Sequence, residues 1–371
     1  MSTLEIDKVS KVYKTGTFGG GLKPALRQVS FDIDKGEVVS LIGQSGSGKS
    51  TLGKIILRLV RASAGAVRFE GTDISKVDKA GLRDYYRHVQ GVFQDPFSSY
   101  NPLYKADRVF EMVRSVYFPH LHGAEWHGRV ESALESVTLN PADVLDKFPH
   151  QLSGGQQQRL LIARALLLDV RLLVADEIIS MLDASTRVDV LNLLVDLKKR
   201  GLGVLFITHD LSLGNYISDR SVILRYGAVV EMGQTQKVFG NPQHPYTKSL
   251  LAAVPQLHKK WEAEGVGAAV VPAAGTGAAN GSTHDDEMRY SKSSLNPLRG
   301  PAHARPSPDS SLVGSPGAQP PGARPSLMDL EGAPWQRSRP AGNRLAAVLE
   351  ANPAPRLVEA EEGHFVAVDG E

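Results

Sequence analysis

The chain has 371 residues, of which 42% are hydrophobic and 22% charged, so it is long enough for one large or two modest globular domains. Its 42 basic and 40 acidic residues give a formal net charge of +2, and this near balance argues against a nucleic-acid partner. The sequence contains no cysteine, which excludes disulfides, thiolate zinc sites and cysteine nucleophiles.

Neither a signal peptide nor a membrane span is indicated. The first residues, MSTLEIDKVSKVYK, lack the apolar core of a signal peptide. The most apolar stretch, RLLIARALLLDVRLLVAD, is interrupted by Arg164, Asp169 and Arg171, so no segment reaches the roughly 18 uncharged apolar residues of a spanning helix. We therefore expect any work at a membrane to be done through partner proteins.

The sequence divides into three parts. Residues 1–257 alternate apolar runs with segments of helical period, a pattern typical of an α/β domain. Residues 258–343 form a predicted linker, because between about Glu264 and Arg324 the chain is mostly alanine, glycine, proline and serine and cannot bury enough apolar surface to order itself. Residues 344–371 recover a pattern: NRLAAVLEAN predicts a short helix and LVEAEEGHFVAV predicts two short strands.

A phosphate-binding loop is predicted at residues 43–50. The apolar run 38–42 fits a buried strand, the loop reads G-x-x-x-x-G-K-S, and a helix is expected after it with Leu52, Ile55, Ile56 and Leu59 on one face. Lys49 would reach the β- and γ-phosphates, and the Ser50 hydroxyl would bind Mg²⁺. The residues expected to bind ATP here are Gly43, Gln44, Ser45, Gly46, Ser47, Gly48, Lys49, Ser50 and Thr51.

Two further strands are predicted to end in polar side chains. RLLVADE ends in Asp176, a candidate Mg²⁺ ligand, and Glu177, a candidate base for the attacking water; VLFIT is followed by His209. Considered one at a time, Glu177 would be interpreted as a solvated turn residue and His209 as a polar residue that caps a strand. Because both strands should lie beside the phosphate-loop strand, with their carboxyl ends at one edge of the sheet, we predict a shared site.

Residues 1–257 closely resemble the ATP-binding subunit of an ATP-binding-cassette (ABC) transporter. The motifs that carry the resemblance occur in the family's order: GQSGSGKST, VFQDP with Gln94, LSGGQQQR, LLVADE, SMLD and ITHD with His209. The resemblance implies an α/β P-loop ATPase core with an N-terminal antiparallel β subdomain and an inserted α-helical subdomain at about 95–165. Glu177, His209 and Gln94 would be catalytic, with Gln94 also near the metal, and Tyr13 would stack on adenine.

The segment LSGGQQQR predicts a second anion-binding site, because its glycines lie at the N-terminus of an expected helix. The phosphate that this site would bind is then to be identified. In the family, two cassettes dimerise head to tail, and this signature turn binds the γ-phosphate held by the partner's P-loop. The resemblance therefore assigns Ser153, Gly154, Gly155 and Gln156 to the ATP of a second cassette, and Asp183 to a link between the two sites.

DPFSSYNP and GNPQHPYTKSLLAAVP narrow the resemblance to the oligopeptide, dipeptide and nickel importer group, and LVEAEEGHFVAV resembles that group's C-terminus. Relatives carry a cysteine-bearing segment after HPYT, which is missing here. The implied protein is an ATPase powering import through two permease subunits, with a second, identical or paralogous ATPase subunit and an extracytoplasmic substrate-binding protein. It would lie peripherally on the cytoplasmic face of the membrane, without a nucleic-acid partner.

Several alternatives stay open at this point. Peptides are the expected cargo, with oligosaccharides or nickel as alternatives, and a non-transport ABC ATPase of DNA repair or translation is the alternative of another class. Phe97, Tyr100 and Tyr104 either line a groove for a permease helix or form local core. Ile178 and Ile179 stand where relatives have other residues and should alter the stiffness of that turn. The histidines of FPHLHGAEWHG are expected to be solvent-facing, and His244 to be structural.

Overall fold

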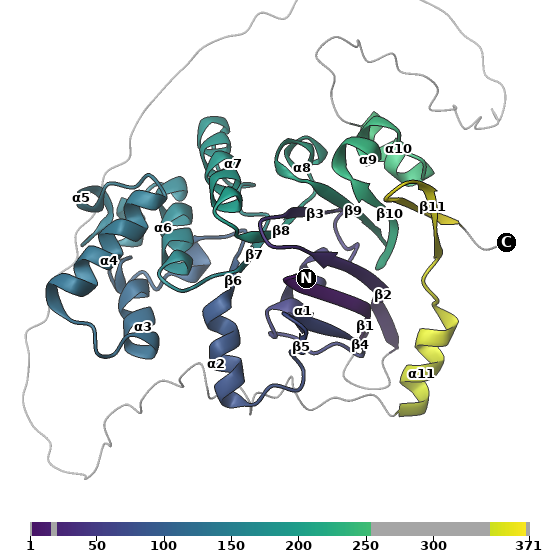
Figure 1. Ribbon diagram of the computed structural model, residues 1–371, viewed down its shortest axis with the longest axis horizontal. Coiled ribbons are helices and arrows are strands. Elements are labelled where there is room, and N and C mark those ends of the chain that lie inside the picture. The colour runs from purple at the N-terminus through teal and green to yellow at the C-terminus, as the bar shows by residue number, and fades with distance from the viewer. Residues whose placement is uncertain (1, 16–20, 254–341, 369–371) are drawn as a thin grey trace, which may run out of the picture. The chain divides into compact units, whose positions relative to one another are not determined.

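The computed structural model describes residues 2–15, 21–253 and 342–368 (Figure 1). Almost all of the predicted linker, up to residue 341, lies outside the described residues. Among the helices described, none has both the length and the apolar character that crossing a bilayer requires.

The strands alternate with helices along most of the chain, as the sequence pattern predicts. Their bounds are β1 (Leu4–Lys14), β2 (Leu22–Ile33), β3 (Val38–Ile42), β4 (Ala64–Phe69), β5 (Thr72–Asp73), β6 (Val89–Val92), β7 (Leu172–Asp176), β8 (Gly203–Thr208), β9 (Arg220–Arg225), β10 (Ala228–Gln234), β11 (Arg356–Glu361) and β12 (His364–Val368).

The α-helices are α1 (Lys49–Ile56), α2 (Lys79–His88), α3 (Arg108–Tyr117), α4 (Gly123–Ser136), α5 (Pro141–Val144), α6 (Gly154–Leu166), α7 (Ala184–Lys199), α8 (Leu211–Ile217), α9 (Thr235–Gly240), α10 (Pro245–Ala252) and α11 (Gly342–Ala351). Two short 3₁₀ turns lie at Phe97–Ser99 and Pro149–Gln151.

The strands form two sheets. The first is antiparallel, in the order β2-β1-β4-β5, and supplies the N-terminal β subdomain that the family resemblance implies. The second is mixed, in the order β11-β12-β10-β9-β3-β8-β7-β6. Within it β9, β3, β8, β7 and β6 run parallel to one another, so their carboxyl ends meet at one edge.

The C-terminal hairpin extends this second sheet. β12 pairs antiparallel with β10, with Glu231 opposite Val366 and Gly233 opposite His364, and β11 then pairs with β12. The helix and two strands expected near the C-terminus are thus present as α11, β11 and β12. A hairpin of two strands is marginal by itself, so pairing with β10 accounts for its order.

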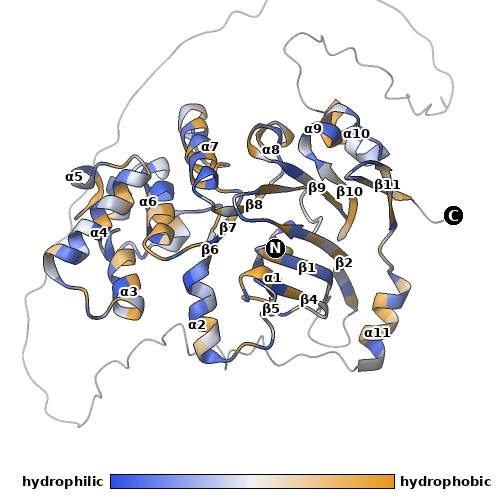
Figure 2. Cartoon of the chain, in the orientation of Figure 1, coloured by the Kyte–Doolittle hydropathy of each residue, from blue (hydrophilic) through white to orange (hydrophobic). Residues whose placement is uncertain are grey.

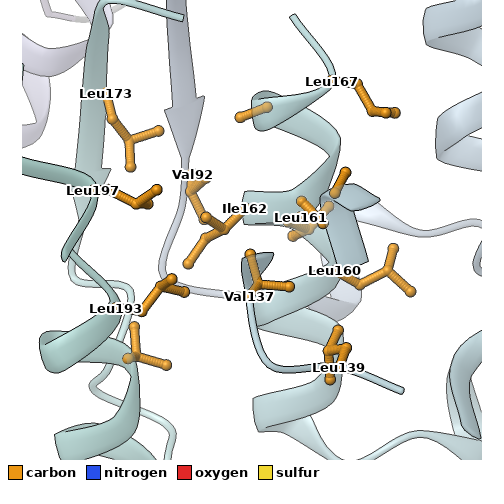
Figure 3. Packing of buried hydrophobic residues seen from close by; sticks show 14 of the residues in the cluster. Val92, Val137, Leu139, Leu160, Leu161, Ile162, Leu167, Leu173, Leu193 and Leu197 are labelled. Carbon is orange, nitrogen blue, oxygen red and sulfur yellow. The ribbon is translucent and has the colours of Figure 1, made fainter. Parts of the chain in front are cut away.

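Helices α3, α4, α5 and α6 gather beyond β6, at the end of the sheet remote from the C-terminal hairpin (Figure 1). Their core is continuous with the sheet: Leu160, Leu161 and Ile162 of α6 lie in one cluster with Val92 of β6 and Leu193 of α7 (Figure 3). These side chains are at most 7% exposed, and burying each contributes about 1.5–3 kcal/mol of transfer free energy. The helical region is therefore anchored to the sheet rather than tethered by loops.

Polar helices mark the outer layer. Helix α2, whose sequence is KAGLRDYYRH, is largely blue in the hydropathy colouring and buries only Tyr85 (Figure 2). Strands β3, β7 and β8, in contrast, are buried at every position. Continuous burial of this kind is typical of parallel strands covered on both faces.

One local prediction differs from the structure. The apolar face predicted after the phosphate loop includes Leu59, but α1 ends at Ile56 and Leu59 is 40% exposed, because the chain turns away through Arg58 with φ at 53°. The effect of Ile178 and Ile179 on the stiffness of their turn stays a prediction; both side chains are buried in the main core, at 1% and 2% exposure. Their burial anchors the turn after β7 by packing.

The three aromatic residues after Gln94 separate into two groups. Tyr100 is core, since its ring is 8% exposed and its hydroxyl donates a hydrogen bond to the Gln157 carbonyl at 2.9 Å. Phe97 is 52% exposed, and Tyr104 carries the guanidinium of Arg108 over its ring, 3.8 Å from the centroid. Tyr100 is therefore a core residue, whereas Phe97 remains accessible for contact with a permease helix.

Candidate functional site

The phosphate loop leaves β3 as a tight turn into α1. Gly43 has no room for a side chain, because a Cβ there would come within 2.2 Å of the Leu224 carbonyl oxygen. Gly46 and Gly48 have φ of 79° and 109°, values that residues with a Cβ rarely adopt. Gly48 forms the N-cap of α1 without any side-chain hydrogen bond, so the first N–H groups of this helix are not occupied by a capping side chain.

Lys49 lies across this loop. It is 5% exposed, and its ammonium group donates hydrogen bonds to the carbonyls of Gly43 at 2.6 Å and Gln44 at 3.0 Å. Burial lowers the pKa of Lys49, while the nearby carboxyl groups of Glu177 and Asp176 act in the opposite direction. A buried cation aimed at a loop with open N–H groups suits a polyanionic ligand.

Asp176 and Ser50 meet at the end of β7. The Ser50 hydroxyl lies 3.4 Å from Oδ1 of Asp176, whose side chain is largely buried. Burial raises the pKa of Asp176, the Ser50 hydrogen bond lowers it, and the charge of Glu177 raises it further. A desolvated carboxylate beside a hydroxyl is a donor pair of the hard-oxygen kind that Mg²⁺ prefers, so these residues fit the metal.

Glu177 and His209 face one another across neighbouring strand ends. Nδ1 of His209 lies 3.3 Å from Oε1 of Glu177, and the Glu177 N–H donates to the Ile207 carbonyl at 2.9 Å. Glu177 has φ at 52°, in the left-handed region, which costs about 1 kcal/mol or more for a residue with a Cβ. This conformation turns the chain out of β7 immediately after Asp176.

Gln94 and Tyr13 lie apart from those contacts. Gln94 is exposed two residues beyond β6, and since Val92 pairs with Ala175, it reaches the same edge of the sheet as Asp176. Within the described part of the chain it makes no side-chain hydrogen bond. Tyr13 lies on β1, is 37% exposed, and has the ammonium of Lys11 over its ring at 5.0 Å.

The signature turn caps its own helix. The Ser153 hydroxyl accepts a hydrogen bond from the Gln156 N–H at 3.2 Å, and Oε1 of Gln156 accepts one from the Ser153 N–H at 2.9 Å. Gly155 packs against Thr186, where a Cβ would lie 2.3 Å from the threonine methyl carbon. The glycine thus permits close contact between α6 and the start of α7.

Asp183 is the N-cap of α7. Its carboxyl group accepts hydrogen bonds from the Ser185 hydroxyl at 2.6 Å, the Thr186 N–H at 3.0 Å and the Thr186 hydroxyl at 2.8 Å. These bonds hold the pKa of Asp183 well below its usual range. The signature turn and the Asp183 turn therefore lie together, through the contact of Gly155 with Thr186.

The predicted site residues thus fall into two groups. The structure brings together Lys49, Ser50, Asp176, Glu177 and His209 at the carboxyl edge of β3, β7 and β8. Among the described residues, no hydrogen bond or ion pair joins this group to the group of Ser153, Gly154, Gly155, Gln156 and Asp183. We refer to the first group, with the phosphate loop, as the P-loop edge.

One contact at the P-loop edge is not predicted by the sequence pattern. The N–H of Gln44 donates a hydrogen bond to the hydroxyl of Tyr246 on α10 at 3.1 Å. The segment containing Tyr246 stood out in the sequence as HPYT, but its 202-residue separation from Gln44 leaves no local signal that the two meet.

Comparisons with known proteins agree with this arrangement. Residues 26–180 match the family model described as ABC transporter, and residues 230–276 match that of the oligopeptide/dipeptide transporter C-terminal region. The chain is 41% identical over 254 residues to the oligopeptide transport ATP-binding protein OppF of Streptococcus mutans, covering 68% of this chain and 82% of that protein. It is 44% identical over 233 residues to the glutathione import ATP-binding protein GsiA of Escherichia coli, covering 62% of this chain and 37% of that protein.

A solved structure supports the fold. The dimeric post-hydrolysis state of the ATP-binding cassette MJ0796, bound to ADP and Pi, superposes with a TM-score of 0.56 at 31% identity, covering 62% of this chain and 98% of that one. The fold class predicted from the sequence is confirmed by this likeness and by the two sheets described above.

Proposed function

Since this chain belongs to the ATP-binding subunits of ABC transporters, we propose that it hydrolyses ATP to power the import of oligopeptides or dipeptides through partner permeases. The observation that carries the proposal is the convergence of Lys49, Ser50, Asp176, Glu177 and His209 on one edge of a parallel sheet. The match of residues 230–276 to the oligopeptide/dipeptide transporter C-terminal region supports the class of cargo.

The P-loop edge would bind the nucleotide through its backbone and Lys49. The N–H groups at the start of α1 would surround the phosphates, and the Lys49 ammonium would exchange its present carbonyl partners for phosphate oxygens. Tyr13 would stack on the adenine ring. Ser50, Asp176 and Gln94 would hold Mg²⁺, whose bound charge offsets the negative charge that develops on the phosphates.

Hydrolysis requires a water positioned in line with the γ-phosphate. Glu177, one residue beyond Asp176, would orient and deprotonate this water, with Gln94 as a second contact. His209, 3.3 Å from Glu177, would donate a hydrogen bond to the γ-phosphate and orient the Glu177 carboxyl group. The P–O bond to ADP breaks as water attacks, and inorganic phosphate leaves.

The second cassette completes the site. Ser153, Gly154, Gly155 and Gln156 have no bond to the P-loop edge of their own chain within the described residues, which supports their acting on the ATP of a partner subunit. Closure would then depend on ATP at the interface, and hydrolysis would release it. Asp183 would couple the two sites, because its turn packs beside the signature turn.

The partners would include two permease subunits, and a permease subunit would dock on this chain near Gln94, where Phe97 and Leu103 are 52% and 76% exposed. We propose that the chain is peripheral on the cytoplasmic face of the membrane. An extracytoplasmic binding protein would then select the cargo.

The test is Glu177→Gln in the native host, with uptake of labelled short peptides, oligosaccharides and nickel measured in parallel. Loss of peptide uptake alone supports the proposal, and loss of another cargo alone corrects its substrate class. Unchanged uptake of all three in a strain without a second peptide system favours a non-transport ABC ATPase. Purified wild-type protein that neither binds nor hydrolyses ATP would contradict the enzymatic part.

A further inference from the structure

The hydroxyl of Tyr246 is a fixed contact of the phosphate loop. It lies 3.1 Å from the N–H of Gln44, the second residue of the loop, and accepts its hydrogen bond. The ring is 7% exposed and packs in a small cluster with Ile42, the last residue of β3, and Ala367 of β12. The guanidinium of Arg225 lies 4.9 Å from the ring centroid. The hydroxyl therefore has little freedom to leave the loop.

Gln44 transmits this contact to Lys49. Its carbonyl accepts hydrogen bonds from the Lys49 ammonium at 3.0 Å and from the Ser47 N–H at 3.2 Å. Both backbone polar groups of the residue are thus engaged, one by Tyr246 and the other by the loop. A change in the position of Gln44 moves the carbonyls around the ammonium that would bind the phosphates.

Tyr246 is itself held by buried hydrogen bonds that reach the C-terminal hairpin. The Tyr246 N–H donates to Nδ1 of His244 at 3.0 Å, and the His244 N–H donates to Oε2 of Glu231 at 3.1 Å. Oε1 of Glu231 accepts from the Gln243 N–H and faces Nε2 of His364, each at 2.8 Å. Glu231 and His364 are both fully buried.

His364 is hydrogen-bonded on one side of its ring. Nε2 of His364 lies 2.8 Å from Oε1 of Glu231, which also accepts from the Gln243 N–H. Nδ1 of His364 is buried and has no hydrogen-bond partner among the described residues. Strand β12, which carries His364, pairs with β10, which carries Glu231, so the contacts run from the C-terminal hairpin to Tyr246.

We propose that Tyr246 is a positioning residue of the phosphate loop, and that His364 of the C-terminal strand supports it through Glu231 and His244. The inference rests on the proposed binding of ATP at the P-loop edge. It adds that the affinity for nucleotide depends on the HPYT segment and on the C-terminal hairpin paired with β10. Tyr246 would act on KM for ATP and leave the chemical step unchanged.

The first experiment is Tyr246→Phe in the full-length protein, with ATP binding measured by calorimetry in the presence of Mg²⁺. Losing one hydrogen bond to the loop should weaken ATP binding about threefold to tenfold and raise KM equally, with kcat unchanged within about twofold. The melting temperature without nucleotide separates positioning from simple destabilisation, because a purely structural role lowers the melting temperature and leaves the affinity of the folded protein unchanged.

Tyr117→Phe is the matched control. It removes a tyrosine hydroxyl that hydrogen-bonds the Arg83 carbonyl, on α3 and away from the P-loop edge. ATP affinity in Tyr246→Phe equal to that of the wild type, or reduced only as much as in Tyr117→Phe, overturns the proposal. Absence of ATP binding in the wild-type protein would instead overturn the proposed function, so the two failures are distinguishable.

The second experiment tests the support from β12. His364→Phe keeps a ring in the same space, removes the hydrogen bond to Glu231, and should weaken ATP binding about twofold. If His364 and Tyr246 act through one chain of contacts, the double variant of His364→Phe and Tyr246→Phe should bind ATP no more weakly than Tyr246→Phe alone. Independent, additive losses would show that His364 acts by another route. Should His364→Phe fold poorly, Glu231→Gln, which keeps the side-chain shape and changes its hydrogen bonding, makes the same comparison.

Discussion

Helices α1 and α6 both begin at glycine-containing turns, and the two turns differ in how they treat their own N–H groups. At α1 the N-cap is Gly48, with φ at 109° and no side-chain hydrogen bond. At α6 the N-cap is Ser153, which forms a capping box with Gln156. The first turn has no capping side chain, and Lys49, Asp176 and Glu177 of the same chain lie beside it. In the second turn, the N–H groups of Ser153 and Gln156 are hydrogen-bonded within the turn.

The residues around the α1 turn and the α6 turn also differ. The α1 turn has a buried lysine and two carboxylates beside it, and burial shifts the pKa of Lys49 down and that of Asp176 up. The α6 turn has the exposed Asp183 turn as its neighbour, and the guanidinium of Arg159 donates a hydrogen bond to its Gly155 carbonyl at 3.4 Å. This difference fits the proposal that the first turn takes part in hydrolysis and the second contacts the nucleotide of a partner subunit.

The comparison is tested most strongly at Glu177. If the P-loop edge carries the chemistry, Glu177→Gln should lower the ATPase rate about 10²- to 10⁴-fold, because the attacking water loses its base, while ATP affinity stays within about twofold. Steady-state phosphate release and ATP binding measure the two effects. Glu131→Gln, an exposed exchange on α4, is the control, and near-normal turnover in Glu177→Gln would assign the base to another residue.

Lys49→Ala should have the next largest effect. Removing a buried cation that bonds phosphate should weaken ATP binding about 10- to 150-fold, the range of a hydrogen bond to a charged group of about 1.5–3 kcal/mol. Calorimetric titration with ATP gives the affinity. Lys199→Ala makes the same exchange at the exposed end of α7 and should bind as the wild type does; equal losses in both variants would point to a general electrostatic effect.

Ser153→Ala sharpens the contrast between the turns. Loss of the cap should lower the free energy of unfolding by about 0.5–2 kcal/mol, with ATP affinity of the single chain unchanged. If this turn binds the partner's nucleotide, as proposed, turnover by the assembled dimer should fall. Urea unfolding, ATP titration under monomeric conditions and ATPase assays give the three values. A weaker ATP affinity in the monomer would mean that the signature turn acts on its own chain's nucleotide.

The smallest effect is expected at Asp183, and it depends on pH. The folded pKa lies below the unfolded value of 3.8, so the carboxylate stabilises the fold above that pH and loses this contribution as the pH falls through the folded pKa. Asp183→Asn should therefore melt below the wild type at pH 5–7, with the difference shrinking below about pH 4. Melting temperatures from pH 2 to 7 test this, with Asp189→Asn as control, and a difference that does not vary with pH would contradict it.

Residues whose positions follow from local pattern were predictable. The strand, glycine loop and lysine of the P-loop edge are contiguous, and the parallel order of β3, β8 and β7 brings Asp176, Glu177 and His209 to one edge without further information. Periodicity could not set where α1 ends, so Leu59 was assigned to a face that stops at Ile56. It also could not separate buried Tyr100 from exposed Phe97, because both lie in an irregular segment.

The sequence by itself determined the strands of the parallel sheet, the phosphate loop and the identity of the polar groups at the strand ends, because apolar periods and glycine spacing encode local conformation. It did not determine strand order: the strands ending at Asp176 and at Thr208 were both predicted beside the phosphate-loop strand, but β8 lies between β3 and β7. Only the tertiary structure decided that Tyr246 bonds Gln44 and that His364 bonds Glu231, contacts separated by 202 and 133 residues. Such contacts arise when distant segments pack in a buried space, where each polar group must find whichever partner the packing presents, and no local pattern records that choice.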